Sequence, residues 1–101
     1  MSTTRKVQAY LEDKDLLEVT ARAVAGQFGI STCTLRRKLR CEGTCLTQLI
    51  IDERWRRFHE ANTNMNLEDL TEITCFTHKQ SFQRAFKSRF GMPITEWRER
   101  V

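Results

Sequence analysis

Residues 34–40 read TLRRKLR, a stretch that places two leucines four positions apart among four cationic side chains. Because successive helical turns bring positions four apart onto one face, Leu35 and Leu39 predict a single apolar stripe. The four cations then occupy the faces that a core leaves free. Two interpretations fit this stretch alone: a solvated surface helix, and a helix that presents positive charge to an anionic partner.

Positive charge is clustered in this sequence rather than spread along it. The chain has 101 residues, the length of one domain, and 17 Lys and Arg against 13 Asp and Glu give a net charge of +4. Residues 12–18 hold four acids and one lysine, whereas residues 36–40 hold four cations and no acid. Such clustering, more than the mildly basic total, is what a phosphate-binding surface requires.

The sequence lacks the residue patterns of a membrane protein, a zinc-binding protein and an enzyme. The sequence has no run of about 18 apolar residues and no apolar leader, so we expect a cytoplasmic protein without membrane contact. The four cysteines are interpreted as reduced thiols, and Cys41 and Cys45 have no second pair or nearby histidine to complete a zinc site. His59 and His78 lack a nucleophile, a carboxylate pair or a glycine-rich phosphate loop around them, so neither an enzyme nor a cofactor is expected.

The chain is predicted to be all-α, because it has one proline, four glycines and almost no alternating apolar runs. Thr20, Ser31 and Asn66 are plausible N-caps, and Gly29 is a plausible helix end. Pro93 suits the first turn of a last helix. The expected helices cover about residues 5–14, 20–28, 31–42, 46–62, 66–74 and 78–90, followed by one from residue 93 onward.

Only GIS, residues 29–31, separates the helix after Thr20 from the helix that begins at Ser31. A connection of three or four residues is typical of a helix-turn-helix, in which the second helix is the one that reads DNA. We therefore expect a first helix-turn-helix unit over about residues 20–42, followed by a linker helix over about residues 46–62.

The same arrangement occurs a second time, at an offset of 47 residues. LRRKLR at 35–40 aligns with FQRAFK at 82–87, so two phenylalanines replace the two leucines. A chance amphipathic helix would not need a short capped helix before it in both places, and we expect a second helix-turn-helix unit over about residues 66–90. Phe86, Phe90, Ile94 and Trp97 are assigned to core packing, whereas Trp55 either is buried between the two halves of the chain or marks a contact surface.

The segments AVAGQFGISTCTLRRKLRCEGTCLTQLIIDERWRR and LEDLTEITCFTHKQSFQRAFKSRFGMPITEWR carry a resemblance to a known family. The second segment has Phe76 after the turn, then SFQRAFK at 81–87, then Phe90 and Gly91, then Trp97 and Arg98. Over about residues 7–100 the chain resembles the DNA-binding domain of the AraC/XylS family of bacterial transcription regulators. The resemblance implies one domain over about residues 5–100, with seven helices in two helix-turn-helix units joined by a long linker helix.

The resemblance also implies which side chains face DNA. The family's base-contacting positions fall on Cys33, Arg36, Arg37, Lys79, Gln80, Gln83 and Arg84. Phosphate contacts are expected from Ser31, Thr32, Arg40, Thr77 and Lys87. Arginine suits the O6 and N7 acceptors of guanine, and glutamine suits adenine. Each of these residues could instead carry only surface charge or contact a phosphate.

The sequence departs from the family pattern in three ways. Cys75 stands where the pattern usually has glycine, which suggests a differently shaped turn. Thr71 and Thr74 occupy places that favour small or apolar residues, so the helix that holds them is expected to be more polar than usual. Pro93 comes one residue earlier than the usual Ser-Pro.

The predicted function is sequence-specific binding of double-stranded DNA by a bacterial, nucleoid-associated transcription regulator that inserts two recognition helices into adjacent major grooves. The alternative is a helical protein-interaction module that modulates another regulator without binding DNA. RNA polymerase is a further candidate partner, through the acidic Glu68, Asp69 and Glu72, although acids at a helix N-terminus also favour the helix dipole. No small-molecule site and no metal are expected.

Overall fold

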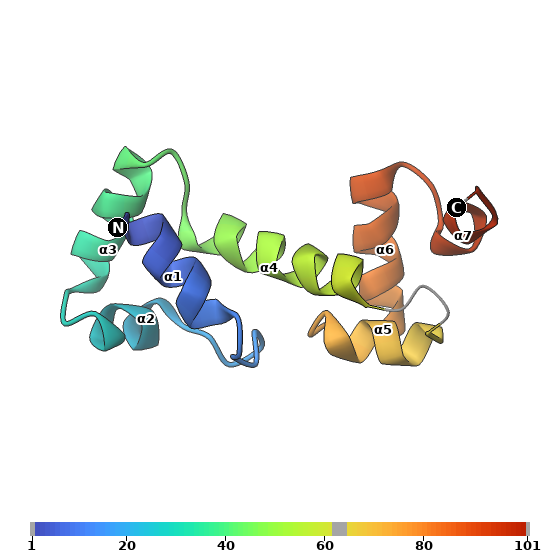
Figure 1. Ribbon diagram of the computed structural model, residues 1–101, viewed down its shortest axis with the longest axis horizontal. Helices are drawn as coiled ribbons and strands as arrows, with labels where there is room; N and C mark the ends of the chain where they lie inside the picture. Colours follow the sequence, from blue (N-terminus) through green and yellow to red (C-terminus); the bar gives the residue numbers. More distant parts are fainter. Residues whose placement is uncertain (1, 62–64, 101) are drawn as a thin grey trace. The chain divides into compact units, whose positions relative to one another are not determined.

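The computed structural model describes residues 2–61 and 65–100, and every regular element in these ranges is an α-helix (Figure 1). The seven helices are α1 (Thr3–Leu11), α2 (Ala21–Gln27), α3 (Thr32–Cys41), α4 (Leu46–Glu60), α5 (Leu67–Ile73), α6 (Lys79–Phe90) and α7 (Ile94–Arg100). The prediction of an all-α fold with seven helices is therefore confirmed. The predicted end of the linker helix at residue 62 lies outside the described residues, and α4 ends at Glu60.

The contacts of the chain divide it into two compact units, Met1–Arg56 and Arg57–Val101. We call them the first unit and the second unit. The first contains α1, α2, α3 and most of α4, and the second contains the end of α4 with α5, α6 and α7. Each unit thus holds one pair of helices that a short turn connects, α2 with α3 and α5 with α6 (Figure 1).

The core of the first unit is mainly aliphatic. Its buried apolar residues are Val7, Leu11, Leu16, Val24, Ala25, Leu35, Leu39, Leu49 and Trp55. The side chain of Trp55 is only 3% exposed, so the interpretation of this residue as part of a contact surface is wrong. Burial of this apolar surface is the main force that holds helix α3 against its neighbours.

Helix α1 begins earlier and ends earlier than predicted. Ser2 caps its N-terminus by accepting a hydrogen bond from the Arg5 N–H at 3.1 Å. The helix stops at Leu11 rather than Lys14. The next backbone hydrogen bond, from the Lys14 N–H to the Leu11 carbonyl, spans three residues instead of the four of an α-helix. The Asp15 carboxylate then accepts from the Leu17 N–H at 3.0 Å, which favours a turn over continued helix.

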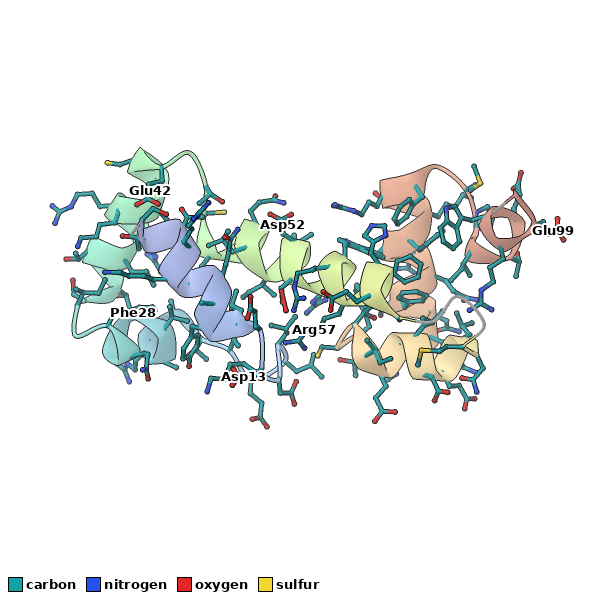
Figure 2. All side chains as sticks on the ribbon, viewed as in Figure 1. Asp13, Phe28, Glu42, Asp52, Arg57 and Glu99 are labelled. Carbon is teal, nitrogen blue, oxygen red and sulfur yellow. The ribbon has the colours of Figure 1, made fainter. Side chains whose placement is uncertain are left out.

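Glu42 fastens the start of α1 to the end of α3. Its two carboxylate oxygens accept the backbone N–H groups of Thr3 at 3.1 Å and Thr4 at 2.8 Å (Figure 2). Hydrogen bonds from Thr4 first, and then from Thr3, hold the pKa of the Glu42 carboxyl below its usual value of 4.5. An acid 38 residues away therefore satisfies amides that a local cap leaves open.

The core of the second unit is mainly aromatic. Phe58 of α4 lies 5.4 Å from Phe86 and 5.5 Å from Trp97, measured between ring centroids. Phe86 in turn stacks on Phe90 at 4.4 Å, and Phe82 packs against Phe76 at 5.8 Å. Edge-to-face and offset contacts of this kind add to the energy of burial. The assignment of Phe86 and Ile94 to the core is confirmed, whereas Phe90 and Trp97 pack against these rings and are half-buried.

The turn after α2 and the turn after α5 close in the same way. The N–H of Ile30 bonds the Ala25 carbonyl, and the N–H of Phe76 bonds the Thr71 carbonyl, so both turns have the backbone bond of a Schellman motif. Gly29 has φ 67° and Cys75 has φ 61°, the left-handed conformation that the motif requires. Cys75 therefore takes in the second turn the backbone conformation that Gly29 takes in the first, and the expectation of a differently shaped turn is wrong at this residue.

Thr71 and Thr74 are buried without leaving their hydroxyl groups unsatisfied. The Thr71 hydroxyl donates to the Leu67 carbonyl at 2.8 Å, and the Thr74 hydroxyl donates to the Leu70 carbonyl at 2.7 Å. Each hydroxyl thus finds its acceptor within its own helix, which allows a polar residue in an apolar position. Pro93 directly precedes α7, and its carbonyl accepts the Trp97 N–H, so it belongs to the first hydrogen-bonded turn.

Candidate nucleic-acid interface

Helix α3 separates its apolar stripe from its charges. Leu35 and Leu39 are each 1% exposed, whereas every cation of the helix is exposed to solvent. These cations are Arg36, Arg37, Lys38 and Arg40, and no acidic residue lies between Thr32 and Cys41. The helix therefore turns an uninterrupted positive surface outward, as binding to the phosphates and bases of DNA requires.

The predicted contacts in the first unit all lie on α3 or at its start. Cys33, in the first turn, is exposed together with the arginines that follow it. Ser31 is the N-cap: its hydroxyl accepts the Thr34 N–H at 3.1 Å and donates to the Thr34 hydroxyl at 2.9 Å. This confirms the predicted cap. Thr32, the first residue of the helix, is half-buried.

Helix α6 repeats the pattern with phenylalanines. Phe82 and Phe86 are fully buried, at 0% exposure, and hold the helix against the aromatic core. The predicted base-contacting residues of this helix, and the two phosphate-contacting residues of the second unit, are all exposed. These residues are Thr77, Lys79, Gln80, Gln83, Arg84 and Lys87.

The N-terminal end of α6 differs from that of α3. Its N-cap residue is His78, whose side chain makes no capping hydrogen bond. Lys79, in the first turn, forms an exposed ion pair with Glu68 of α5 at 3.2 Å. An exposed pair of this kind contributes little to stability.

A cleft lies beside each recognition helix. In the first unit a cleft of about 300 Å³ runs between α3 and the start of α4, and its lining includes Arg36, Arg40 and Thr47. In the second unit a cleft of about 290 Å³ runs between α6 and the start of α7, and its lining includes Arg84 and Lys87. Neither cleft is predictable from the spacing of apolar and charged residues, because the residues that close them come from the helix that follows each helix-turn-helix.

Other kinds of site have little support in the described residues. No group of three or more His, Cys, Asp or Glu among residues 2–61 and 65–100 is arranged to hold a metal ion. All four cysteines are free thiols, and Cys41 and Cys45 are exposed. Within the same ranges, no helix is both long and apolar enough to cross a bilayer.

Comparison with known proteins agrees with this architecture. A family model described as a helix-turn-helix domain matches residues 24–100. No curated protein matches the chain significantly.

Two solved structures share the fold. A DNA-binding transcriptional dual regulator from Escherichia coli K-12 superposes with a TM-score of 0.86 at 22% identity, and the match covers 100% of this chain and 99% of that one. The transcriptional regulator CdpR from Pseudomonas aeruginosa superposes with a TM-score of 0.83 at 24% identity over 96% of this chain and 31% of CdpR. With the family match over residues 24–100, which is most of the sequence, the chain belongs to the AraC-type helix-turn-helix family of DNA-binding transcription regulators.

Proposed function

We propose that the chain regulates transcription by sequence-specific binding of double-stranded DNA, with α3 and α6 as its two recognition helices. The observation that carries this proposal is the repeated amphipathic pattern: a fully buried apolar stripe and an exposed, acid-free cationic face on both helices. A solvated surface helix needs no such exclusion of acids. Two helices with such an acid-free face, at equivalent places in two helix-turn-helix units, fit a partner with a repeating negative charge.

The base-reading residues are proposed from side-chain chemistry. Arg37 and Arg84 occupy equivalent positions of α3 and α6, and each presents two donors that fit the O6 and N7 acceptors of guanine. Gln80 and Gln83 can pair with adenine through one donor and one acceptor. Arg36, Lys79 and Cys33 complete the set of base contacts, Cys33 as a small apolar group that suits a thymine methyl.

The phosphate contacts are proposed to fix the register of each helix on the duplex. Arg40 and Lys87 lie one turn beyond the base-reading residues, at equivalent positions. Ser31, Thr32 and Thr77 lie at the start of the two recognition helices. We infer that α3 and α6 enter adjacent major grooves of one duplex, about 34 Å apart, so that one chain reads two half-sites.

The proposal extends to the protein partner and the place of action. RNA polymerase is the proposed protein partner, and the exposed carboxylates of Glu68, Asp69 and Glu72 on α5 offer a polar surface for it. Glu68 and Asp69 also lie in the first turn of α5, where they favour the helix dipole. Binding to chromosomal DNA would associate the protein with the bacterial nucleoid.

The salt dependence of binding tests the function directly. A labelled duplex of random sequence is titrated with the protein at several salt concentrations. If about six phosphates are neutralised, log affinity falls with log salt at a slope of about −5. Absence of binding to random duplex at low salt would favour the protein-interaction module instead. Selection of bound sequences from a random pool then measures specificity.

A further inference from the structure

The clefts beside α3 and α6 share two features: two cationic side chains on one wall, and the start of the next helix on the other. Each is lined by two side chains of the recognition helix that carry positive charge, Arg36 and Arg40 in the first unit and Arg84 and Lys87 in the second. The opposite wall in each case is the first turn of the next helix, which begins with Leu46 or with Ile94. The two clefts therefore lie at comparable places in the two units, each between a helix and the first turn of the helix that follows it.

A threonine occupies the same place in both clefts. Thr47 is the second residue of α4, Thr95 is the second residue of α7, and both are exposed and line their clefts. Neither hydroxyl has a hydrogen-bond partner among the described residues. An exposed, uncommitted donor beside two cations is suited to an anionic oxygen.

Charge distinguishes these two clefts from a third one in the molecule. The third cleft, of about 220 Å³, lies between α1 and α4 and includes Glu12, Asp52 and Glu53 in its lining. The clefts beside the recognition helices have no acid in their lining. A phosphate would be repelled from the acidic cleft and attracted to the other two.

We propose that each of these two clefts seats one phosphate of the DNA backbone, with Arg40 in the first cleft and Lys87 in the second as its charge partner and the threonine hydroxyl as an additional donor. The inference rests on the proposed binding of duplex DNA and adds Thr47 and Thr95 to its contact residues. The lining of the first cleft also includes the apolar side chains of Leu35 and Leu39, which carry no negative charge that would repel a phosphate.

The experiment compares Thr47→Val and Thr95→Val with Thr47→Ser and Thr95→Ser. Valine keeps the shape and removes the hydroxyl, whereas serine keeps the hydroxyl. Each valine variant should weaken binding to selected and to random duplex by the same factor, roughly three- to tenfold, and each serine variant should bind within about twofold of the wild type. Gln48→Ala, at an exposed position of α4 outside the cleft, should bind as the wild type does.

The salt slope separates the hydroxyl from the charges. Because threonine carries no charge, both valine variants should keep the wild-type slope, whereas Arg40→Gln should make the slope shallower by about 0.9. Replacing single phosphates of the duplex with neutral methylphosphonates should locate the seats. One such replacement should have a smaller effect with Thr47→Val than with the wild type, and a different one should have a smaller effect with Thr95→Val.

The outcomes are distinct. If the valine variants bind random and selected duplex as tightly as the wild type, or if they alter base preference, this inference is wrong while the proposed function stands. If the wild type itself does not bind duplex at low salt, the proposed function is wrong. Far-ultraviolet circular dichroism and thermal unfolding check that each variant is folded.

Discussion

The first unit packs leucines and valines around α3, whereas the second packs phenylalanines and a tryptophan around α6. Both units nevertheless hold an amphipathic helix in the same manner, with two apolar residues four positions apart under an exposed cationic face. The comparison shows that the spacing of the buried residues, rather than their identity, positions a recognition helix.

The turns of the two units differ in length and in capping. The first unit has four residues between its two helices, 28–31, with glycine in the left-handed position and a serine cap. The second has five residues, 74–78, with Cys75 in that position and no side-chain cap at His78. The turn of the second unit has other contacts in place of the missing cap, among them a hydrogen bond of 3.3 Å from Arg57 to the sulfur of Cys75.

Cutting away one core residue in each unit gives the largest expected effects. Phe86→Ala should destabilise the protein by about 4 kcal/mol, because it removes a fully buried ring that contacts the rings of Phe58, Phe82, Phe90 and Trp97, and Leu39→Ala by about 3 kcal/mol. Denaturant unfolding followed by fluorescence measures both, since Trp55 reports on the first unit and Trp97 on the second. A loss below about 1 kcal/mol for Phe86→Ala would show that the aromatic cluster is not the core of the second unit.

The caps of the two recognition helices should respond in opposite directions. Ser31→Ala removes the acceptor of the Thr34 N–H and should cost about 1 kcal/mol of unfolding free energy. His78→Ser supplies a hydroxyl where none now caps α6 and should add up to about 1 kcal/mol. Thermal unfolding of the two variants and the wild type checks both signs. If both substitutions destabilise, His78 stabilises its helix by another contact.

The left-handed positions offer a smaller test of the same kind. Gly29→Ala should cost about 1 kcal/mol through backbone strain alone, because nothing lies within 4 Å of an added Cβ there. Cys75→Gly should stabilise by roughly 0.5 kcal/mol, since relief of strain exceeds the added freedom of the unfolded chain. Chemical denaturation measures both changes. A loss of stability in Cys75→Gly would mean that the hydrogen bond from Arg57 outweighs the strain.

The smallest expected effect is on the stability of the protein at acidic pH, through the carboxyl group of Glu42. The pKa of Glu42 is lower in the folded protein than its usual value of 4.5, so its stabilising contribution is present above that pH and is lost as the pH falls through the lowered value. The melting temperature of the wild type should therefore fall more steeply below about pH 4.5 than that of Glu42→Gln. Asp13→Asn, at an exposed acid of the first unit, should follow the wild type. Parallel curves for Glu42→Gln and the wild type would contradict the contact with Thr3 and Thr4.

Local signals in the sequence were sufficient for most of the fold. Thr20, Ser31 and Asn66 cap their helices as predicted, because a capping side chain acts on amides only three residues ahead. The spacing of leucines and phenylalanines also located both recognition helices and the exposed positions on them.

Contacts between distant residues could not be predicted in the same way. The hydrogen bonds from Thr3 and Thr4 to Glu42 span 39 and 38 positions of the sequence. No local sequence pattern near either end predicts them. The clefts that include Thr47 and Thr95 need two helices to be placed side by side before they exist. The end of α1 at Leu11 was missed because apolar spacing says little about where a turn replaces a helix.

Selection of bound sites from a random duplex pool, repeated with Arg37→Ala and Arg84→Ala, tests the two-helix account most directly. The wild type should enrich two motifs about ten base pairs apart, and each substitution should cost roughly 1 to 3 kcal/mol of binding free energy and relax one base pair in a different motif. A single short motif, or two substitutions that relax the same motif, would contradict the reading of one duplex by both helices.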